Sequence, residues 1–303
     1  MYYLGIDGGG SKTAFVLTDG QNNVVRETMG APSNPVDVGI DTAIAVIGEG
    51  INLLLDGIPY DAVSVFAGIA GCMTGESRER IRAYLNTLGC AYADCGGDVQ
   101  NVVAAGLGRR DGICTIMGTG SATFAQKDGE LLRFGGYGYL LEEGGSGFSL
   151  GRDALRAALE AEELSGEPTL IYWLLLDRLQ APSVLPILPD IYGGGKSYIA
   201  SLSPLVLLAY EKGDAVATRI LRDNMACVAK ELSKARRALC SDRPVRTVLA
   251  GGLTARADLL LPLIKEQLDH PQMYDITALT QPPVMGAVAL AKEKYHDQNR
   301  NEK

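Results

Sequence analysis

An internal repeat constrains the fold of this chain more than any other feature of its sequence. A strand, a glycine turn, a second strand, an Asp-Gly turn and a third strand are predicted over residues 2–7, 13–18 and 24–29, and again over 113–117, 122–126 and 130–134. The Asp-Gly turns, Asp19-Gly20 and Asp128-Gly129, are typical of hairpins. The repeat predicts two copies of one α/β unit, with a cleft between them that favours a small-molecule site.

The remaining elements follow from the spacing of apolar residues. In the first copy we expect a helix over 36–55, a strand over 62–69, a helix over 76–88, a strand over 90–94 and a helix over 99–107. In the second copy helices fill most of 153–239, a strand covers 247–250 and a last helix covers 284–295.

The boundary between the copies is predicted near residue 112. No linker rich in Pro, Gly or Ser interrupts the chain there, so we expect a hinge in a continuous chain. The first domain is expected at 1–112, with the C-terminal helix 284–303 packed back on it. The second domain is expected at 113–283 and holds a helical insertion.

Composition excludes several classes of function. The 303 residues, of which 47% are hydrophobic, can bury a core in each of two domains. A net charge of -8 leaves no basic face for nucleic acid or for an anionic membrane. No apolar run reaches the roughly 18 residues of a membrane span, and the first residues lack the pattern of a secretion signal. We expect a cytoplasmic protein that binds neither nucleic acid nor membrane.

Cysteine and histidine usage narrows the chemistry further. The six cysteines are scattered and form no C-x-x-C pair, so reduced and mostly buried thiols are expected. The two histidines, His270 and His296, lie far downstream of every glycine-rich motif. Histidine-based catalysis and histidine metal sites are therefore not expected.

The first glycine turn has the composition of a phosphate clamp. It contains Asp7, Gly8, Gly9, Gly10, Ser11, Lys12 and Thr13. Consecutive glycines let backbone N–H groups turn toward a polyphosphate, and Lys12 and Thr13 could add hydrogen bonds. Asp7, at the end of a buried strand, suits a hydrated Mg²⁺ ion. Taken alone, an ordinary hairpin turn capped by Asp7 explains the motif equally well.

The equivalent turn of the second copy strengthens this interpretation. It reads Gly118-Thr119-Gly120-Ser121, again small and polar between an apolar strand and its return. Two hairpins of this kind can grip one triphosphate from both sides, which neither Walker A nor Rossmann loops do.

Two further glycine runs have some features of nucleotide sites. Gly251-Gly252 follows a strand and would let a nucleoside approach the backbone, although many strand-to-helix turns carry this pair without a ligand. The run 193–197, with sequence GGGKS, resembles a phosphate loop but has Pro189 where Walker spacing needs glycine, and we interpret it as a connection.

Candidates for a base and for a sugar site lie elsewhere. Asp98 starts a predicted helix, where it acts either as an N-cap or as a base for a substrate hydroxyl, and Asp94 competes for the second role. The glycine-flanked Tyr137 could pack on a pyranose ring, with Glu142 and Glu143 as acceptors for its hydroxyls. An ordinary glycine-rich loop explains this segment as well, and Asn34 between prolines is equally typical of a turn.

Together these motifs resemble the N-acetylglucosamine kinase and BadF/BadG-type ATPase family, within the sugar kinase, Hsp70 and actin superfamily. The resemblance runs over nearly the whole chain, through GIDGGGSKT, SNP, GIAG, GGDV, GTGS, FGGYGYLLEEGGSGFSLGRDAL, ASLSPLVLLAYEKGD, LAGGL and PPVMGAVALA. It implies two ribonuclease-H-like domains with mixed five-stranded sheets flanked by helices, and ATP with Mg²⁺ and sugar bound in the cleft. A homodimer is left open.

The resemblance also implies roles for single residues. It places the nucleotide at Thr13, Thr119 and Ala200 and makes Asp98 the base. The motifs themselves add Asp7, Gly9, Gly10, Ser11, Lys12, Gly118, Gly120, Gly251 and Gly252 on the nucleotide side, with Asp7 at the metal. The sugar is expected at Asn34, Gly71, Asp98, Ser121, Ala122, Gly136, Tyr137, Gly138 and Glu143.

The implied reaction is phosphorylation of an amino sugar, with N-acetylglucosamine 6-phosphate as the expected product and a role in cell-wall recycling. Glu143 stands where many relatives carry aspartate, which moves the carboxylate by about a methylene and leaves N-acetylmuramic acid and glucosamine open as substrates.

Two alternatives belong to other classes of protein. An activator ATPase for acyl-CoA reductases or dehydratases would bridge an iron–sulfur cluster with a cysteine such as Cys114, ahead of the second glycine turn. A sugar-sensing regulator would need a DNA-binding helix-turn-helix, for which the predicted first strand at Tyr2 leaves no room.

Overall fold

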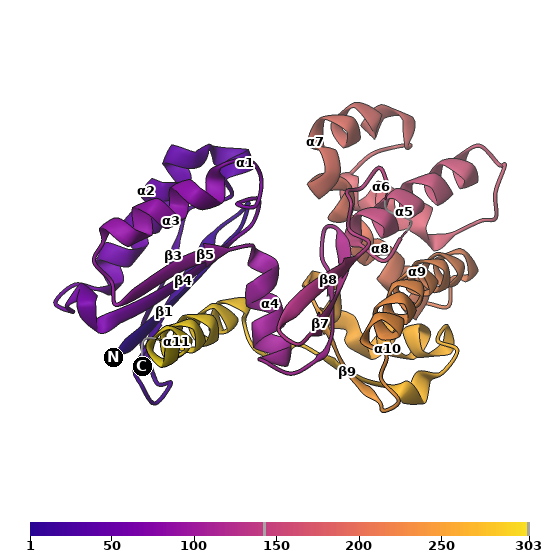
Figure 1. Ribbon diagram of the computed structural model, residues 1–303. Coiled ribbons are helices and arrows are strands. Elements are labelled where there is room, and N and C mark those ends of the chain that lie inside the picture. Colours follow the sequence, from indigo (N-terminus) through magenta and orange to yellow (C-terminus); the bar gives the residue numbers. More distant parts are fainter. Residues whose placement is uncertain (142–143, 302–303) are drawn as a thin grey trace. The chain divides into compact units, whose positions relative to one another are not determined.

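The computed structural model describes residues 1–141 and 144–301, which form two units. The first contains Met1–Arg109 and the chain from Leu279, and the second contains Arg110–Ala278. The C-terminal segment thus returns to the first unit. Each unit is built on one five-stranded sheet (Figure 1).

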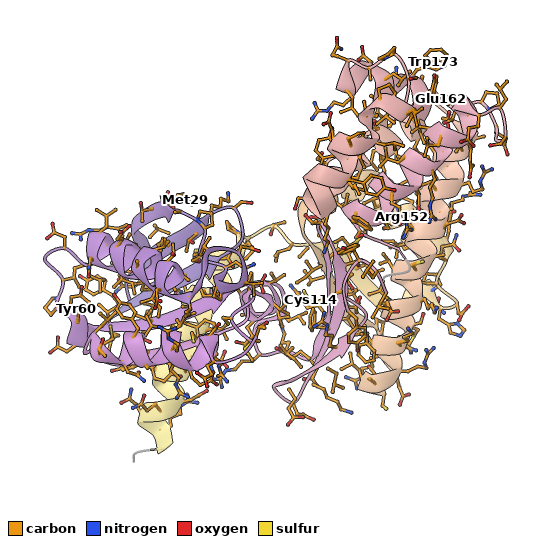
Figure 2. All side chains as sticks on the ribbon, turned by 90° about the horizontal axis from the view of Figure 1, so that it is seen from above. Met29, Tyr60, Cys114, Arg152, Glu162 and Trp173 are labelled. Carbon is orange, nitrogen blue, oxygen red and sulfur yellow. The ribbon has the colours of Figure 1, made fainter. Side chains whose placement is uncertain are left out.

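The sheet of the first unit has the order β3-β2-β1-β4-β5. Its strands are β1 (Tyr2–Gly8), β2 (Thr13–Thr18), β3 (Val24–Gly30), β4 (Val63–Ile69) and β5 (Tyr92–Gly96). The hairpins β1–β2 and β2–β3 are antiparallel, whereas β4 pairs in parallel with both β1 and β5. The central strand β4 is buried along its length, and the edge strand β3 leaves Met29 exposed (Figure 2).

Helices cover both faces of this sheet. They are α1 (Pro35–Val38), α2 (Ile40–Leu54), α3 (Ser77–Thr87), α4 (Asp98–Leu107) and α11 (Pro283–Asn301), with a 3-10 turn at Tyr60–Ala62. The last helix, α11, packs on α4 and β1 (Figure 1). Gly286 allows this approach, because a Cβ there would lie 1.9 Å from the carbonyl oxygen of Asn101 on α4.

The sheet of the second unit repeats the same topology, with the order β10-β9-β6-β7-β8. Its strands are β6 (Gly112–Met117), β7 (Ser121–Lys127), β8 (Glu130–Phe134), β9 (Val245–Ala250) and β10 (Tyr274–Ala278). Again the hairpins β6–β7 and β7–β8 are antiparallel, and β9 pairs in parallel with both β6 and β10. The structure confirms the duplicated α/β unit predicted from the repeat, and it confirms the mixed five-stranded sheets of the ribonuclease-H-like fold that the resemblance implies.

The second unit holds more helix than the first. Its helices are α5 (Gly147–Glu162), α6 (Leu170–Leu179), α7 (Leu188–Ala200), α8 (Ser203–Glu211), α9 (Ala215–Leu239) and α10 (Ala257–Glu266), with 3-10 turns at Leu185–Ile187, Gly252–Arg256 and Pro271–Met273. The long helix α9 packs on β7 and contributes many residues of the core. Helices α5 to α7 supply a smaller, separate apolar cluster.

Three details differ from the sequence prediction. The helix expected over 36–55 is divided at Gly39, whose φ of 80° is left-handed and ends α1. Strand β10 was not located, because Tyr274–Ala278 is short and only partly apolar. The GGGKS run is helical, inside α7, with a break at Gly195. Among the described residues, no helix has the length and apolar character that a membrane crossing needs.

Candidate functional site

The first glycine turn and Asp98 line the same cavity in the first unit. Its volume is about 240 Å³, and its walls are Asp7, Gly8, Gly9, Gly10, Ser11, Lys12, Ala14 and Asp98. The turn is closed by the N–H of Gly9, which donates to the carbonyl oxygen of Lys12 at 3.0 Å. The structure therefore brings the predicted phosphate turn, the predicted metal ligand and the predicted base together.

Asp7 is held in place by an asparagine that the sequence did not single out. Asn101, fully buried on α4, donates through Nδ2 to Asp7 Oδ1 at 2.7 Å and to the carbonyl oxygens of Ile6 and Gly68, each at 3.2 Å. The only signal in the sequence was its position three residues after Asp98, on the same face of a helix. Asn101 positions the carboxylate of Asp7.

Burial raises the pKa of both carboxyl groups in this cavity. For Asp7 the hydrogen bond from Asn101 opposes the effect of burial, the charge of Asp98 adds to it, and Lys12 opposes it. For Asp98 the backbone N–H groups of Val99 and of Asp98 itself oppose it. A carboxylate with a raised pKa binds a proton or a cation more strongly than a solvated one.

The structure separates the two candidates for the base. Asp98 is the first residue of α4, and the N-cap position belongs to Gly97, which makes no side-chain cap. Asp94 is buried beside three cations, with Lys294 at 3.4 Å, Arg82 at 3.5 Å and Arg78 at 4.0 Å. Asp94 is therefore engaged in an ion network, and only Asp98 lines the cavity.

Thr13 points away from this cavity. Its hydroxyl is fully buried and donates to the carbonyl oxygen of Ala31 at 2.6 Å, with Ser33 Oγ at 2.8 Å as its second partner. The side chain thus braces the turn from behind, and a contact of Thr13 with nucleotide would have to come from its backbone.

Two sugar candidates of the first unit lie side by side. Asn34 caps α1, with Oδ1 accepting from Val36 N at 3.1 Å and Nδ2 donating to Asp37 Oδ2 at 2.6 Å. A Cβ on Gly71 would lie 2.1 Å from Asn34 Oδ1, so the two residues touch. Asp37 in turn adjoins Gly10 of the glycine turn, 2.9 Å from the place of a Cβ there.

In the second unit the nucleotide candidates gather at the carboxyl ends of β6 and β9. The turn at Gly118 is closed by its N–H, which donates to the carbonyl oxygen of Gly120 at 2.9 Å. Helix α5 begins against it, because Gly147 N donates to Gly118 O at 2.8 Å and Phe148 N donates to Thr119 O at 3.1 Å. Ala200 touches Gly147, and the backbone of Met117 lies against Gly251, which precedes Gly252.

A second cavity, of about 190 Å³, holds most sugar candidates of the second unit. Its walls are Ser121, Ala122, Phe134, Gly135, Gly136, Tyr137, Leu141, Gly144, Cys227, Val228, Glu231 and Lys234. Tyr137 is 66% exposed and its ring carries the Arg133 guanidinium 5.2 Å from the centroid. Gly138 is not among the lining residues, and Glu143 lies outside the described residues.

Helix α9 supplies residues to this site that the sequence did not reveal. Asn224 Oδ1 accepts from Gly145 N at 2.9 Å and from Ser149 Oγ at 2.6 Å, which fixes the loop where α5 begins. Glu231 lines the cavity and accepts from Lys234 Nζ at 2.7 Å through Oε1. Both residues lie in an amphipathic helix whose pattern predicts only packing, so no local signal could have marked them.

Comparisons with known proteins identify the family of this chain. The model of the BadF/BadG/BcrA/BcrD ATPase family matches residues 4–291. An N-acetylmuramic acid/N-acetylglucosamine kinase from Clostridium acetobutylicum is 30% identical, over 97% of this chain and 99% of that protein. An N-acetyl-D-glucosamine kinase from Dictyostelium discoideum is 27% identical, over 95% and 97%.

The fold is shared with solved structures. The crystal structure of a candidate N-acetylglucosamine kinase from Chromobacterium violaceum superposes with a TM-score of 0.75, covering 96% of this chain and 98% of that one at 22% identity. At 22% identity this match shows a shared fold. Membership of the family is shown by the family model, which matches residues 4–291. The resemblance inferred from the motifs is confirmed: the protein belongs to the BadF/BadG/BcrA/BcrD ATPase family.

Proposed function

We propose that this protein is an amino-sugar kinase that transfers the γ-phosphoryl group of ATP to N-acetylglucosamine, giving its 6-phosphate. The single observation that carries the proposal is the cavity in which Asp98 faces the glycine turn and Asp7. The kinases of amino sugars among the relatives, which match this chain from end to end, support the choice of substrate class.

The residues of the first unit supply the chemistry. Asp98 would accept the proton of the sugar hydroxyl while the hydroxyl oxygen bonds to the γ-phosphorus and the bond to the bridging oxygen of ADP breaks. Asp7, oriented by Asn101, fits as the protein ligand of a hydrated Mg²⁺ ion, whose charge would neutralise phosphate oxygens. Backbone N–H groups of residues 8–12 would donate to the polyphosphate.

The residues of the second unit supply binding. We assign the turn 118–120, together with Ala200, Gly251 and Gly252, to the nucleotide. The cavity beside Ser121 and Tyr137 is assigned to the sugar, where an aromatic face and a few polar groups suit a pyranose. N-acetylmuramic acid and glucosamine are the alternative substrates. The cytoplasmic location and a homodimer stay predictions.

The activator ATPase is disfavoured by the state of its candidate cysteine. Cys114 lies within the sheet of the second unit (Figure 2) and is fully buried. Burial raises the pKa of its thiol to about 12. A cluster needs an accessible thiolate, which this position does not favour.

The function is tested by measuring ADP release with N-acetylglucosamine, N-acetylmuramic acid, glucosamine, glucose and no sugar. We expect the largest kcat/KM with N-acetylglucosamine, little release without sugar, and a phosphorus-coupled NMR signal at C6 of the product. ADP release at the same rate with and without sugar would favour an ATPase. Sugar binding without ADP release would favour a sensor. Either result contradicts the proposal.

A further inference from the structure

Lys196 of the GGGKS run lies beside the second glycine turn, residues 118–120. The run sits inside α7, and Gly195 interrupts the helix with φ 61° and ψ -155°, so the chain is redirected immediately before Lys196. The four residues after Lys196 continue to Ala200, which touches the start of α5. The break therefore turns one end of α7 toward the second glycine turn.

The ammonium group of Lys196 lies against Gly120. Its Nζ is 3.2 Å from the position that a Cβ on Gly120 would occupy. Gly120 closes the turn through its carbonyl oxygen, which accepts from Gly118 N. A glycine at this position leaves the space in which the lysine head group rests beside the backbone of the turn.

No anionic partner explains this placement. Among the described residues, no carboxylate forms an ion pair with Lys196, although its side chain is half-buried. Lys212, by comparison, is an exposed lysine of the second unit. A half-buried cation beside a glycine turn attracts an anion, and a phosphate oxygen is a ligand that ammonium groups and backbone N–H groups both bind.

We propose that Lys196 donates a charge-assisted hydrogen bond to a phosphate oxygen of the bound nucleotide, and that it is a binding residue of the second glycine turn. This inference rests on the proposed function, because it needs a nucleoside polyphosphate at residues 118–120. It reverses the interpretation of the GGGKS run as a connection: the run is no Walker loop, yet the fold brings its lysine to a phosphate turn of another kind.

The test is calorimetric binding of ADP, adenosine and inorganic tripolyphosphate to the wild-type chain and to three variants. Lys196→Met removes the charge but keeps the length of the side chain, Lys196→Arg keeps the charge, and Lys212→Met is the matched control on the surface. We expect Lys196→Met to weaken ADP and tripolyphosphate by about 10- to 100-fold. Adenosine should bind unchanged, because it offers no phosphate.

Further variants test whether the charge and the position of Lys196 account for the change in affinity. Lys196→Arg should recover most of the affinity for ADP, and Lys212→Met should leave it at the wild-type value. Gly120→Ala, which places a methyl group 3.2 Å from the resting position of Nζ, should weaken ADP by a smaller factor than Lys196→Met. A thermal unfolding curve for each variant shows that the protein is folded, and Lys196→Gln replaces Lys196→Met if the latter is not.

The outcomes separate this inference from the function on which it rests. If wild type binds ADP and phosphorylates sugar but Lys196→Met and Lys196→Gln bind ADP equally well, only the role of Lys196 is wrong. Equal weakening of ADP and adenosine would also overturn it, because the effect would then be structural. If wild type binds neither ADP nor tripolyphosphate, the proposed function and the inference fall together.

Discussion

The two glycine turns of this protein have the same place in two copies of one fold but different surroundings. The turn of the first unit lies beside two carboxylates, Asp7 and Asp98, in one cavity. The turn of the second unit is backed by the start of α5 and accompanied by Lys196. One copy of the repeated turn therefore adjoins acidic side chains and the other adjoins a cation, and on the proposed function the first serves the chemistry and the second serves binding.

An asparagine supports each turn, and here too the copies differ. Asn101 in the first unit holds a carboxylate, whereas Asn224 in the second unit holds the backbone of Gly145 and the hydroxyl of Ser149. One asparagine therefore orients the carboxylate of Asp7 and the other orients the loop where α5 begins.

Among the variants that compare the two copies, the largest effect on activity is expected from Asp7→Asn. If Asp7 is the protein ligand of Mg²⁺ that we propose, losing its carboxylate should lower kcat/KM for MgATP at least about 100-fold and raise the Mg²⁺ concentration needed for half-maximal rate. The control is Asp41→Asn, which removes an exposed carboxylate from the same unit. Activity of Asp7→Asn near the wild-type level would show that the carboxylate beside the first turn is not needed, and would contradict the difference in role between the two turns.

Replacing the two asparagines should change different kinetic parameters. Each truncation to alanine leaves buried partners unpaired and should lower the free energy of unfolding by about 2 kcal/mol. Asn101→Ala should lower kcat about tenfold, because Asp7 loses its orientation. Asn224→Ala should raise KM for the sugar and leave kcat within about twofold. Steady-state kinetics with urea unfolding tests both, and the same kinetic signature for the two variants would contradict their separate roles.

A smaller effect is expected from Ser121→Ala in the second cavity. Ser121 lines the cavity that we assign to the sugar, so removing its hydroxyl should raise KM for the sugar about 3- to 10-fold without changing KM for MgATP. Thr123→Val is the matched control two residues along β7, because its hydroxyl pairs with Thr115 at 2.8 Å inside the fold. That variant should change stability alone. An altered KM for ATP in Ser121→Ala would place this cavity on the nucleotide instead.

The smallest effect concerns stability and pH. Burial raises the pKa of Asp98 above its ordinary value of 3.8, so the folded protein binds this proton more tightly than the unfolded chain. The ionised group then destabilises the fold at pH above the raised pKa, and the penalty disappears as pH falls through it. Asp98→Asn should raise Tm by about 2 °C near neutral pH and by less in acid. A gain that grows in acid would contradict the sign of the shift.

Much of the fold could be predicted because the turns and the apolar spacing are set by neighbouring residues, and because the same pattern occurs twice in the sequence. The glycine turns, the Asp-Gly turns and the strands beside them are each set by neighbouring residues. Strand β10 could not be placed, since pairing with β9 rather than its own pattern makes it a strand. Gly39 likewise divided a helix whose apolar spacing continued on both sides.

The site was predictable only where motifs carry the chemistry. Asp7 and Asp98 stand in glycine-rich segments, and the structure brings them into one cavity. The positions of Asn101, Asn224 and Lys196 were not predicted, because they arise from contacts between distant segments. Lys196 shows this best: its own motif suggested the wrong kind of loop, and only the break in α7 brings it to Gly120.

The central claim is that Asp98 takes the proton of the sugar hydroxyl, and a pH profile of single-turnover phosphoryl transfer tests it most directly. With wild type the rate should fall in acid with an apparent pKa above 3.8, the ordinary value for this group. Asp98→Asn should bind ATP and sugar normally, transfer phosphate about 100- to 10,000-fold more slowly, and lose that acid limb. Transfer near the wild-type rate with the limb intact would contradict the account.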